Sequence, residues 1–112
     1  MRNRRAAALA VLLSLAAAPL LAQDPPKRTE NFQTYCAVCH GDDGKAATEE
    51  GKKKGARDLT GKKWQGSVSD DQLLSSVTKG RDKMPAFGKK LSADEIKALV
   101  REVREIGGKK AS

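Results

Sequence analysis

The feature that most constrains this chain is a five-residue run, Cys36-Ala37-Val38-Cys39-His40. Its two cysteines and its histidine are the only residues of these types among the 112 of the sequence. A Cys-x-x-Cys-His run is typical of a site at which haem is attached covalently. Each thiol can add to a vinyl group of the porphyrin, and the histidine that follows can reach the iron from the same side. The run therefore predicts a domain that is built around one porphyrin.

Other uses of the two cysteines remain open. A structural zinc site needs about four nitrogen or sulfur ligands, and the chain offers three, Cys36, Cys39 and His40. A thioredoxin-like pair would be expected beside a strand-helix-strand pattern, and no strand-rich segment precedes Cys36. Thiol–disulfide chemistry stays as the main alternative to haem attachment, and two buried thiols are a third.

Met84 is the candidate for a second iron ligand. Apart from the initiating residue it is the only methionine, and it is followed by Pro85. Histidine and methionine form a known axial pair in cytochromes c, and this pair raises the reduction potential. Proline fixes a backbone dihedral and suits an irregular loop that holds a sulfur in place. A methionine can also simply fill a core, but the chain has no second histidine, so we expect His40 and Met84 to bind the metal.

The N-terminus has the pattern of a secretory signal. Three arginines fall within the first five residues, an apolar run covers 6–18, and Ala22 is a small residue at a plausible cleavage point. The run is shorter than the ~20 residues that span a bilayer comfortably, although an anchor that is not cleaved is the alternative. We predict a signal peptide over 1–22, one domain over 23–112, and a periplasmic or otherwise exported protein without stable membrane insertion.

Size and charge set two further expectations. The full chain has a formal net charge of +8, and removal of the three leader arginines leaves about +5. A domain of this length buries a modest share of its surface, and it contains only one Trp, one Tyr and two Phe. A bound porphyrin would supply the missing apolar mass, so the haem-free chain should fold poorly.

Three helices are predicted, over about 29–39, 69–80 and 92–106, and no strands, so the fold class is all-α. The second and third open with capping boxes, Ser69 with Gln72 and Ser92 with Glu95. The third carries the clearest apolar stripe, which consists of Ile96, Leu99, Val100, Val103 and Ile106. The segment 41–66 is rich in Gly and Lys and has no periodicity, so we expect a long structureless loop that wraps the haem.

Over residues 32–106 the chain resembles a small bacterial class I cytochrome c. The likeness rests on Cys36 to Gly41, on Gly55-Ala56-Arg57-Asp58-Leu59, on Lys83-Met84-Pro85-Ala86-Phe87 and on the last helix. The resemblance implies helices that wrap one covalent haem c, with the first and last helices crossing at nearly a right angle. It also implies that Leu59 packs on the porphyrin and that Trp64 either bonds a haem propionate or only packs.

Two departures from the family pattern stand out. Many relatives carry proline at the position of Arg57, whose carbonyl accepts a hydrogen bond from the iron-binding histidine. A carbonyl remains here, so we expect the bond to persist in a softer loop. Relatives also pack a small residue against an aromatic one where the terminal helices cross, and this chain has Arg28 and Glu102 there. These two residues either form an ion pair or both point to solvent.

The family's usual function is single-electron transfer, which needs no catalytic residue. We expect a monomeric carrier that cycles Fe(II) and Fe(III) between redox proteins and does not bind nucleic acid. Five basic residues bracket Met84 and would steer a partner with an acidic docking surface: Lys79, Arg81, Lys83, Lys89 and Lys90. The run Lys52 to Lys54 is interpreted as a solvated loop. Two alternatives remain: a subunit docked on a dehydrogenase or terminal oxidase, and a haem-based peroxidase or gas sensor.

Overall fold

The computed structural model describes residues 27–109, so the predicted signal peptide and its cleavage point lie outside the described residues. Within the described part, the regular elements are helices, with one isolated β-bridge between Arg81 and Met84. The helices are η1 (Phe32–Cys36), α1 (Ala37–His40), α2 (Glu49–Lys54), α3 (Lys62–Ser67), α4 (Asp70–Lys79) and α5 (Ala93–Ile106). The predicted all-α fold is confirmed.

The three helices predicted from the sequence are all present. The first is continuous across η1 and α1, and its first half is wound as a π-helix, a form that is frequent at functional sites. At the start of α4 the Ser69 side chain accepts a hydrogen bond from the backbone N–H of Gln72. The Gln72 side-chain oxygen in turn accepts one from the backbone N–H of Ser69. Ser92 and Glu95 do the same for α5. Both predicted capping boxes are therefore formed.

The expectation of a structureless loop over 41–66 is wrong, because α2 and α3 lie within it. Thr48 caps the start of α2, where its side chain accepts a hydrogen bond from the Gly51 backbone, and Gly55 in the left-handed region (φ 64°) caps its end. Its first turn is acidic and its last turn, Lys52 to Lys54, is basic, which matches the helix dipole. These lysines therefore lie on a helix rather than in a loop. Helices α2 and α3 have only six residues each, which is too few for an apolar periodicity to be recognised in the sequence.

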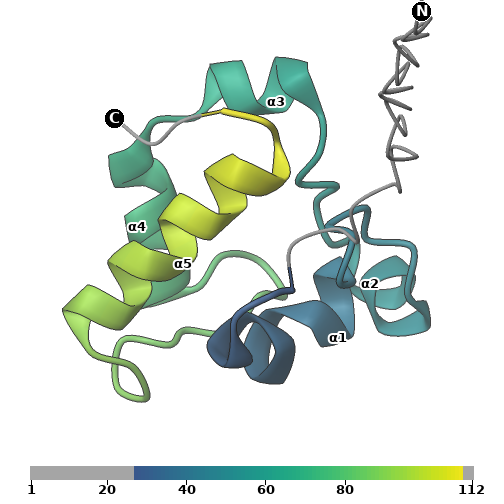
Figure 1. Ribbon diagram of the computed structural model, residues 1–112. Helices are drawn as coiled ribbons and strands as arrows, with labels where there is room; N and C mark the ends of the chain where they lie inside the picture. The colour runs from purple at the N-terminus through teal and green to yellow at the C-terminus, as the bar shows by residue number, and fades with distance from the viewer. Residues whose placement is uncertain (1–26, 110–112) are drawn as a thin grey trace, which may run out of the picture.

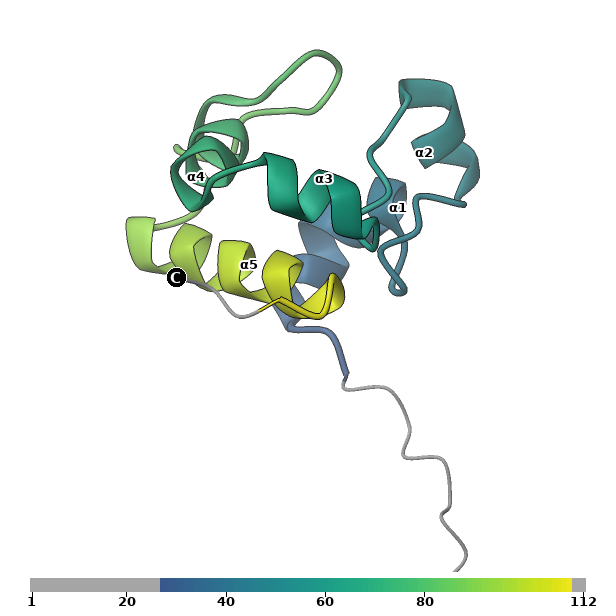
Figure 2. The same cartoon turned by 90° about the horizontal axis from the view of Figure 1, so that it is seen from above.

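The helices enclose a small core. Helix α4 packs beside α5, and α2 packs beside α1 at the other end of the domain (Figures 1 and 2). The core is a cluster of buried side chains from η1, α4, α5 and the segments that connect the helices: Phe32, Cys36, Leu59, Val77, Phe87, Leu91, Ile96 and Leu99. Among residues 27–109, no helix has the length and apolar character needed to cross a bilayer.

Where the N-terminal segment meets α5, the ion pair between Arg28 and Glu102, one of the two expected alternatives, is not formed. Glu102 accepts hydrogen bonds from the backbone N–H (2.9 Å) and the hydroxyl (2.6 Å) of Thr29. Arg28 instead donates from Nε to the carbonyl of Asp42 at 2.9 Å. The alternative, two solvent-facing side chains, fails as well, because Glu102 is only 6% exposed. The backbone N–H and the hydroxyl of Thr29, at the start of the first helix, thus satisfy the Glu102 carboxylate without an arginine.

Candidate functional site

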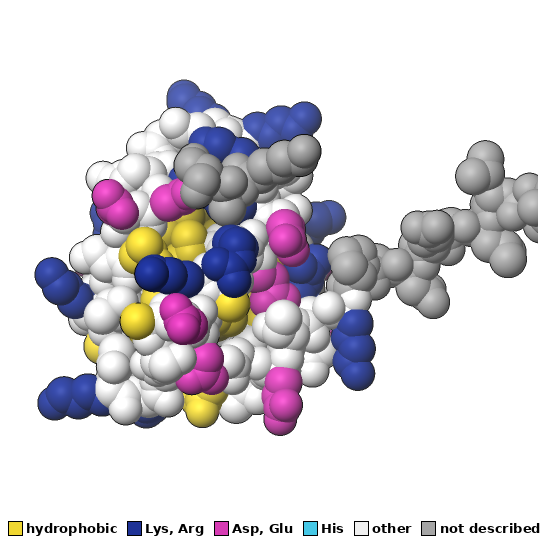
Figure 3. Space-filling view, turned by 60° about the vertical axis from the view of Figure 1, so that its left-hand side comes forward, with side chains coloured by type: hydrophobic (Ala, Val, Ile, Leu, Met, Phe, Trp, Pro, Cys, Tyr) yellow, Lys and Arg dark blue, Asp and Glu magenta, His cyan; other side chains and the backbone are white. Residues whose placement is uncertain are grey.

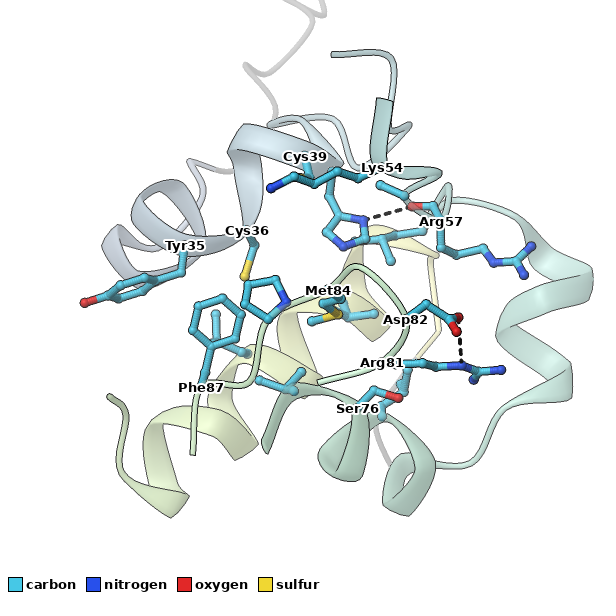
Figure 4. Close-up of a pocket in the computed structure, with 18 of the residues that line it drawn as sticks. Tyr35, Cys36, Cys39, Lys54, Arg57, Ser76, Arg81, Asp82, Met84 and Phe87 are labelled. Atoms are coloured by element: carbon cyan, nitrogen blue, oxygen red, sulfur yellow. Dashed lines mark hydrogen bonds and ion pairs between the residues drawn. The ribbon is translucent and has the colours of Figure 1, made fainter. Parts of the chain in front are cut away.

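One pocket brings together the six site residues predicted from the sequence, Cys36, Cys39, His40, Leu59, Trp64 and Met84. Its lining comes from η1 and α1, from α4 and α5, from the segment 54–59 with Trp64 of α3, and from the segment around Met84 (Figure 4). The core residues of these helices thus face a shared cavity. Residues that are far apart in the sequence meet here as the motif predicted.

His40 lies at the end of α1, and its orientation is fixed by one hydrogen bond. Its Nδ1 lies 2.9 Å from the carbonyl oxygen of Arg57 (dashed in Figure 4). A carbonyl oxygen can only accept, so Nδ1 carries the proton and Nε2 keeps its lone pair. Burial lowers the pKa of His40 below its ordinary value, although the bond to Arg57 acts in the opposite direction. The net lowering by burial favours a neutral imidazole. The bond from Nδ1 to Arg57 leaves Nε2 free for a metal.

Helix α1, which carries Cys39 and His40, is held by Thr48, the residue that caps α2. The sequence analysis did not single out Thr48. The Thr48 hydroxyl lies 2.8 Å from the Val38 carbonyl and 3.0 Å from the Cys39 carbonyl, two backbone acceptors of α1. Gly51 allows this approach, because a Cβ at that position would overlap the Cys39 carbonyl oxygen. Thr48 precedes two glutamates, so its role as a helix cap was the available signal.

The two thiols differ in their surroundings. Cys36 is buried and Cys39 is half-buried, and neither is in a disulfide. Burial raises the pKa of Cys36 to about 11, and the nearby charges of Glu102 and Cys39 act in the same direction. The thiolate is the form that exchanges disulfides or binds zinc. The Cys36 environment therefore works against both alternative uses of the cysteine pair.

Met84 is held in the opposite wall by a tight turn. Arg81 and Met84 exchange backbone hydrogen bonds of 3.1 and 2.8 Å, and Asp82 between them has a positive φ of 50°. Gly80 allows the chain to fold back, since its φ is 76° and a Cβ there would lie 2.7 Å from the Met84 carbonyl oxygen. The Met84 side chain points into the pocket (Figure 4). The sulfur thus sits on a segment whose backbone is closely determined.

The residues present fit a covalently held haem. The thiols and the imidazole lie on one side of the pocket, and the thioether comes from another. This is the donor set of a haem c with His and Met as axial ligands. Between them, the lining is largely apolar, as a porphyrin requires, and consists of Phe32, Leu59, Leu73, Val77, Phe87, Leu99, Val100 and Val103.

The rim of the pocket is basic, and part of it was missed by the sequence analysis. Lys54, Arg57, Arg81 and Lys83 line it, with Asp82 as an acidic neighbour. The Arg57 guanidinium lies over the Trp64 ring, 5.9 Å from its centroid. Lys54 reaches the pocket from the end of α2.

Comparisons with known proteins agree with this geometry. Residues 23–101 match the family described as cytochrome c oxidase, cbb3-type, subunit III. The cbb3-type cytochrome c oxidase subunit FixP of Azorhizobium caulinodans is 39% identical over 83 residues, 73% of this chain. This chain covers 27% of the length of that relative. The dehydrogenase subunit of a quinone alcohol dehydrogenase from Gluconacetobacter polyoxogenes is 38% identical over 71 residues, which is 60% of this chain and 8% of that protein.

Smaller proteins are similar over more of their length. Cytochrome c6 of Rippkaea orientalis is 37% identical over 78 residues, which is 70% of this chain and 67% of that protein. The solved structure of the KustC0563 c-type cytochrome superposes with a TM-score of 0.64 at 36% identity, and the match covers 71% of this chain and 94% of that one. The chain belongs to the cytochrome c family and is a small class I cytochrome c, whose cofactor is one covalently attached haem c.

Proposed function

We propose that this chain is an exported single-electron carrier. The observation that carries the proposal is the convergence of Cys36, Cys39, His40 and Met84 on one apolar pocket. When bound, haem c supplies a one-electron couple between Fe(II) and Fe(III). The signal peptide over 1–22 and the domain over 23–112 remain part of the proposal, and the mass of the exported protein tests them.

The proposed roles of the site residues follow from their positions. Cys36 and Cys39 would hold the porphyrin through thioether bonds. His40 would bind iron through Nε2, because Nδ1 is engaged with the Arg57 carbonyl. Met84 would bind from the opposite side, and Leu59 and Trp64 would pack against the porphyrin. If His40 and Met84 both bound the iron, no position on it would be left for a substrate, which favours a carrier over an enzyme.

A carrier docked on an enzyme is the second candidate. It is favoured by relatives that are named as subunits of an oxidase and of a quinone alcohol dehydrogenase. The pocket would be the same in both cases, so the distinction lies in a stable partner. Purification of the native protein at low salt separates the two, because a docked subunit would elute as a larger complex.

The replacement Met84→Ala tests the proposed coordination. We expect the variant to keep its covalent haem, to lose the methionine-to-iron charge-transfer band and to bind carbon monoxide in the reduced state. Its reduction potential should fall, because the thioether ligand raises it. Lys83→Ala, next to it in the same exposed turn, is the matched control and should leave the spectrum unchanged. Avid binding of carbon monoxide by the unmodified protein would instead favour the peroxidase or sensor function.

We further propose that a partner with an acidic surface docks at the basic rim and that the carrier is a monomer. The rim lysines and arginines are exposed, as are Lys79, Lys89 and Lys90 nearby. By contrast, the face in Figure 3 interleaves Lys and Arg with Asp and Glu side chains. A positive rim would raise the rate of encounter with anionic partners, and salt would screen this effect over about 10 Å at 0.1 M.

Charge reversal at Lys83 and Lys89 tests this docking face. With hexacyanoferrate(III) as an anionic probe, oxidation of the double variant should be slower at low salt and should converge with the unmodified protein at high salt. Lys62→Glu combined with Lys63→Glu, two exposed lysines of α3 outside the pocket lining, changes the net charge by the same amount and is the control. Equal rates for the rim variant and the unmodified protein at low salt would contradict docking at this face.

A further inference from the structure

A buried polar cluster stands directly behind the pocket wall. It consists of Arg104 of α5, Gln65 of α3 and Asp70 of α4, and we name it the Arg104 cluster. Arg104 and Gln65 are each only 2% exposed. The Arg104 guanidinium donates from Nε to the Asp70 carboxylate (2.7 Å) and from Nη2 to the Val68 carbonyl (2.7 Å). Its Nη1 donates to the backbone carbonyl (2.8 Å) and the side-chain oxygen (2.9 Å) of Gln65.

Gln65 connects the Arg104 cluster to the wall of the pocket. Its Nε2 donates to the carbonyl of Leu59 at 2.8 Å and to that of Val103 at 2.9 Å. Leu59 and Val103 line the pocket, whereas the three residues of the Arg104 cluster are not among the lining residues. The amide of Gln65 is thus bound on its oxygen side by Arg104 and on its nitrogen side by the wall of the pocket.

The Gln65 side chain fits only because residue 107, which lies against it, is a glycine. Gly107 follows α5 with an ordinary φ of −80°, so its backbone does not require glycine. A Cβ at this position would nevertheless overlap the Gln65 side chain. Glycine is therefore needed here for room, and the room is occupied by Gln65.

Stability alone is a weak explanation for the cluster. Burying a charge is costly, and a buried ion pair is often no more stabilising than apolar residues of the same volume. Helix α3, in contrast, has six residues and cannot be stable by itself. It is bound to α5 through Gln65, and it carries the adjacent Trp64, which lines the pocket. The cluster thus determines where this helix lies.

We propose that Arg104 is a positioning residue for the haem pocket. Through Gln65 it fixes the Leu59 carbonyl and the short helix that presents Trp64, without touching the cofactor. This inference rests on the proposed haem site, and it assigns to a residue outside the site the control of one of its walls.

The test uses the intact haem-loaded protein and two readouts besides stability. Trp64 is the only tryptophan, so the reduced protein gives one indole N–H resonance, which the porphyrin ring current displaces according to position. The reduction potential is the second readout. We expect Gln65→Met and Gly107→Ala to shift both and to speed amide exchange in α3. Arg104→Gln should do so more strongly, and Arg104→Lys should restore only part of the effect, because an ammonium lacks the planar fork.

Arg101→Gln is the matched control, an exposed arginine on the same helix that carries the same charge change. It should leave the indole resonance unchanged. If Arg104→Gln does not fold, Gln65→Met decides, since it keeps the volume and leaves Arg104 bound to Asp70 and Val68. An unshifted indole resonance and potential in Gln65→Met, with only a lower unfolding midpoint, would overturn the proposal. Absence of covalent haem from the unmodified protein would instead count against the proposed function.

Discussion

At the scale of single residues, the crossing of the N-terminal segment with α5 depends on the Glu102 carboxylate. Thr29 donates to it twice, and the Thr29 hydroxyl also accepts from the backbone of Phe32 (3.3 Å). We expect Thr29→Val to lower the free energy of unfolding by about 1–2 kcal/mol, the range for a lost helix cap or a hydrogen bond to a charged group. Guanidinium chloride titration measures this loss.

The control for this prediction keeps the hydroxyl. Thr29→Ser should retain most of the stability, and Arg28→Ala combined with Glu102→Gln should show additive losses, since Arg28 bonds the Asp42 carbonyl instead. A coupling between Arg28 and Glu102 as large as that between Thr29 and Glu102 would contradict this assignment.

At the scale of an element, Glu95 links the start of α5 to the first helix. It accepts from the Ser92 backbone (3.0 Å) and from the Asn31 amide (3.0 Å). These hydrogen bonds, chiefly the one from the Ser92 backbone, hold its pKa below the ordinary 4.5. A lowered carboxyl pKa means that the stabilisation is complete above pH 4.5 and is lost as the pH falls through the lowered value.

The corresponding prediction is a difference in acid sensitivity. Glu95→Gln can still accept from the Ser92 backbone but cannot be protonated. Its stability should therefore fall less between pH 6 and pH 3 than that of the unmodified protein, as measured by denaturant titration at each pH. Glu105→Gln, exposed on the same helix, serves as the comparison. Parallel pH profiles for Glu95→Gln and the unmodified protein would refute the proposed linkage.

How well each element could be predicted depended on where its stability comes from. Helices α4 and α5 have capping boxes and an apolar stripe, so their own sequence specifies them. Helix α3 is held through Gln65 by Val103 and Arg104, far away in the chain, and no local pattern predicts such contacts. Helix α2 has local capping residues, Thr48 and Gly55, but it is too short for an apolar stripe. The motif could be interpreted because its chemistry is local: two thiols and an imidazole lie within five residues. The buried position of Arg104 could not be predicted, because an arginine in an amphipathic helix ordinarily faces solvent.

At the scale of the whole molecule, the core and the cofactor site are the same region. Of the core cluster, Phe32, Cys36, Leu59, Val77, Phe87 and Leu99 also line the pocket. Each of these side chains would contact a porphyrin held in the pocket, and the chain has only four aromatic residues to replace such contacts. Water would enter an empty pocket of this kind, and close packing across it would be lost.

The haem-free chain should accordingly lack a cooperative fold. In a variant with Cys36→Ala and Cys39→Ala, produced without haem, we expect some helical far-UV circular dichroism, little near-UV signal from Trp64 and fast amide exchange in α3 and α4. The haem-loaded protein should unfold in one transition, because the apolar surface of the pocket is then covered. A haem-free variant that melts in a single sharp transition with a native near-UV spectrum would show that the helices specify the core without the cofactor. The porphyrin would then bind to a chain that is already folded, and folding would not depend on it.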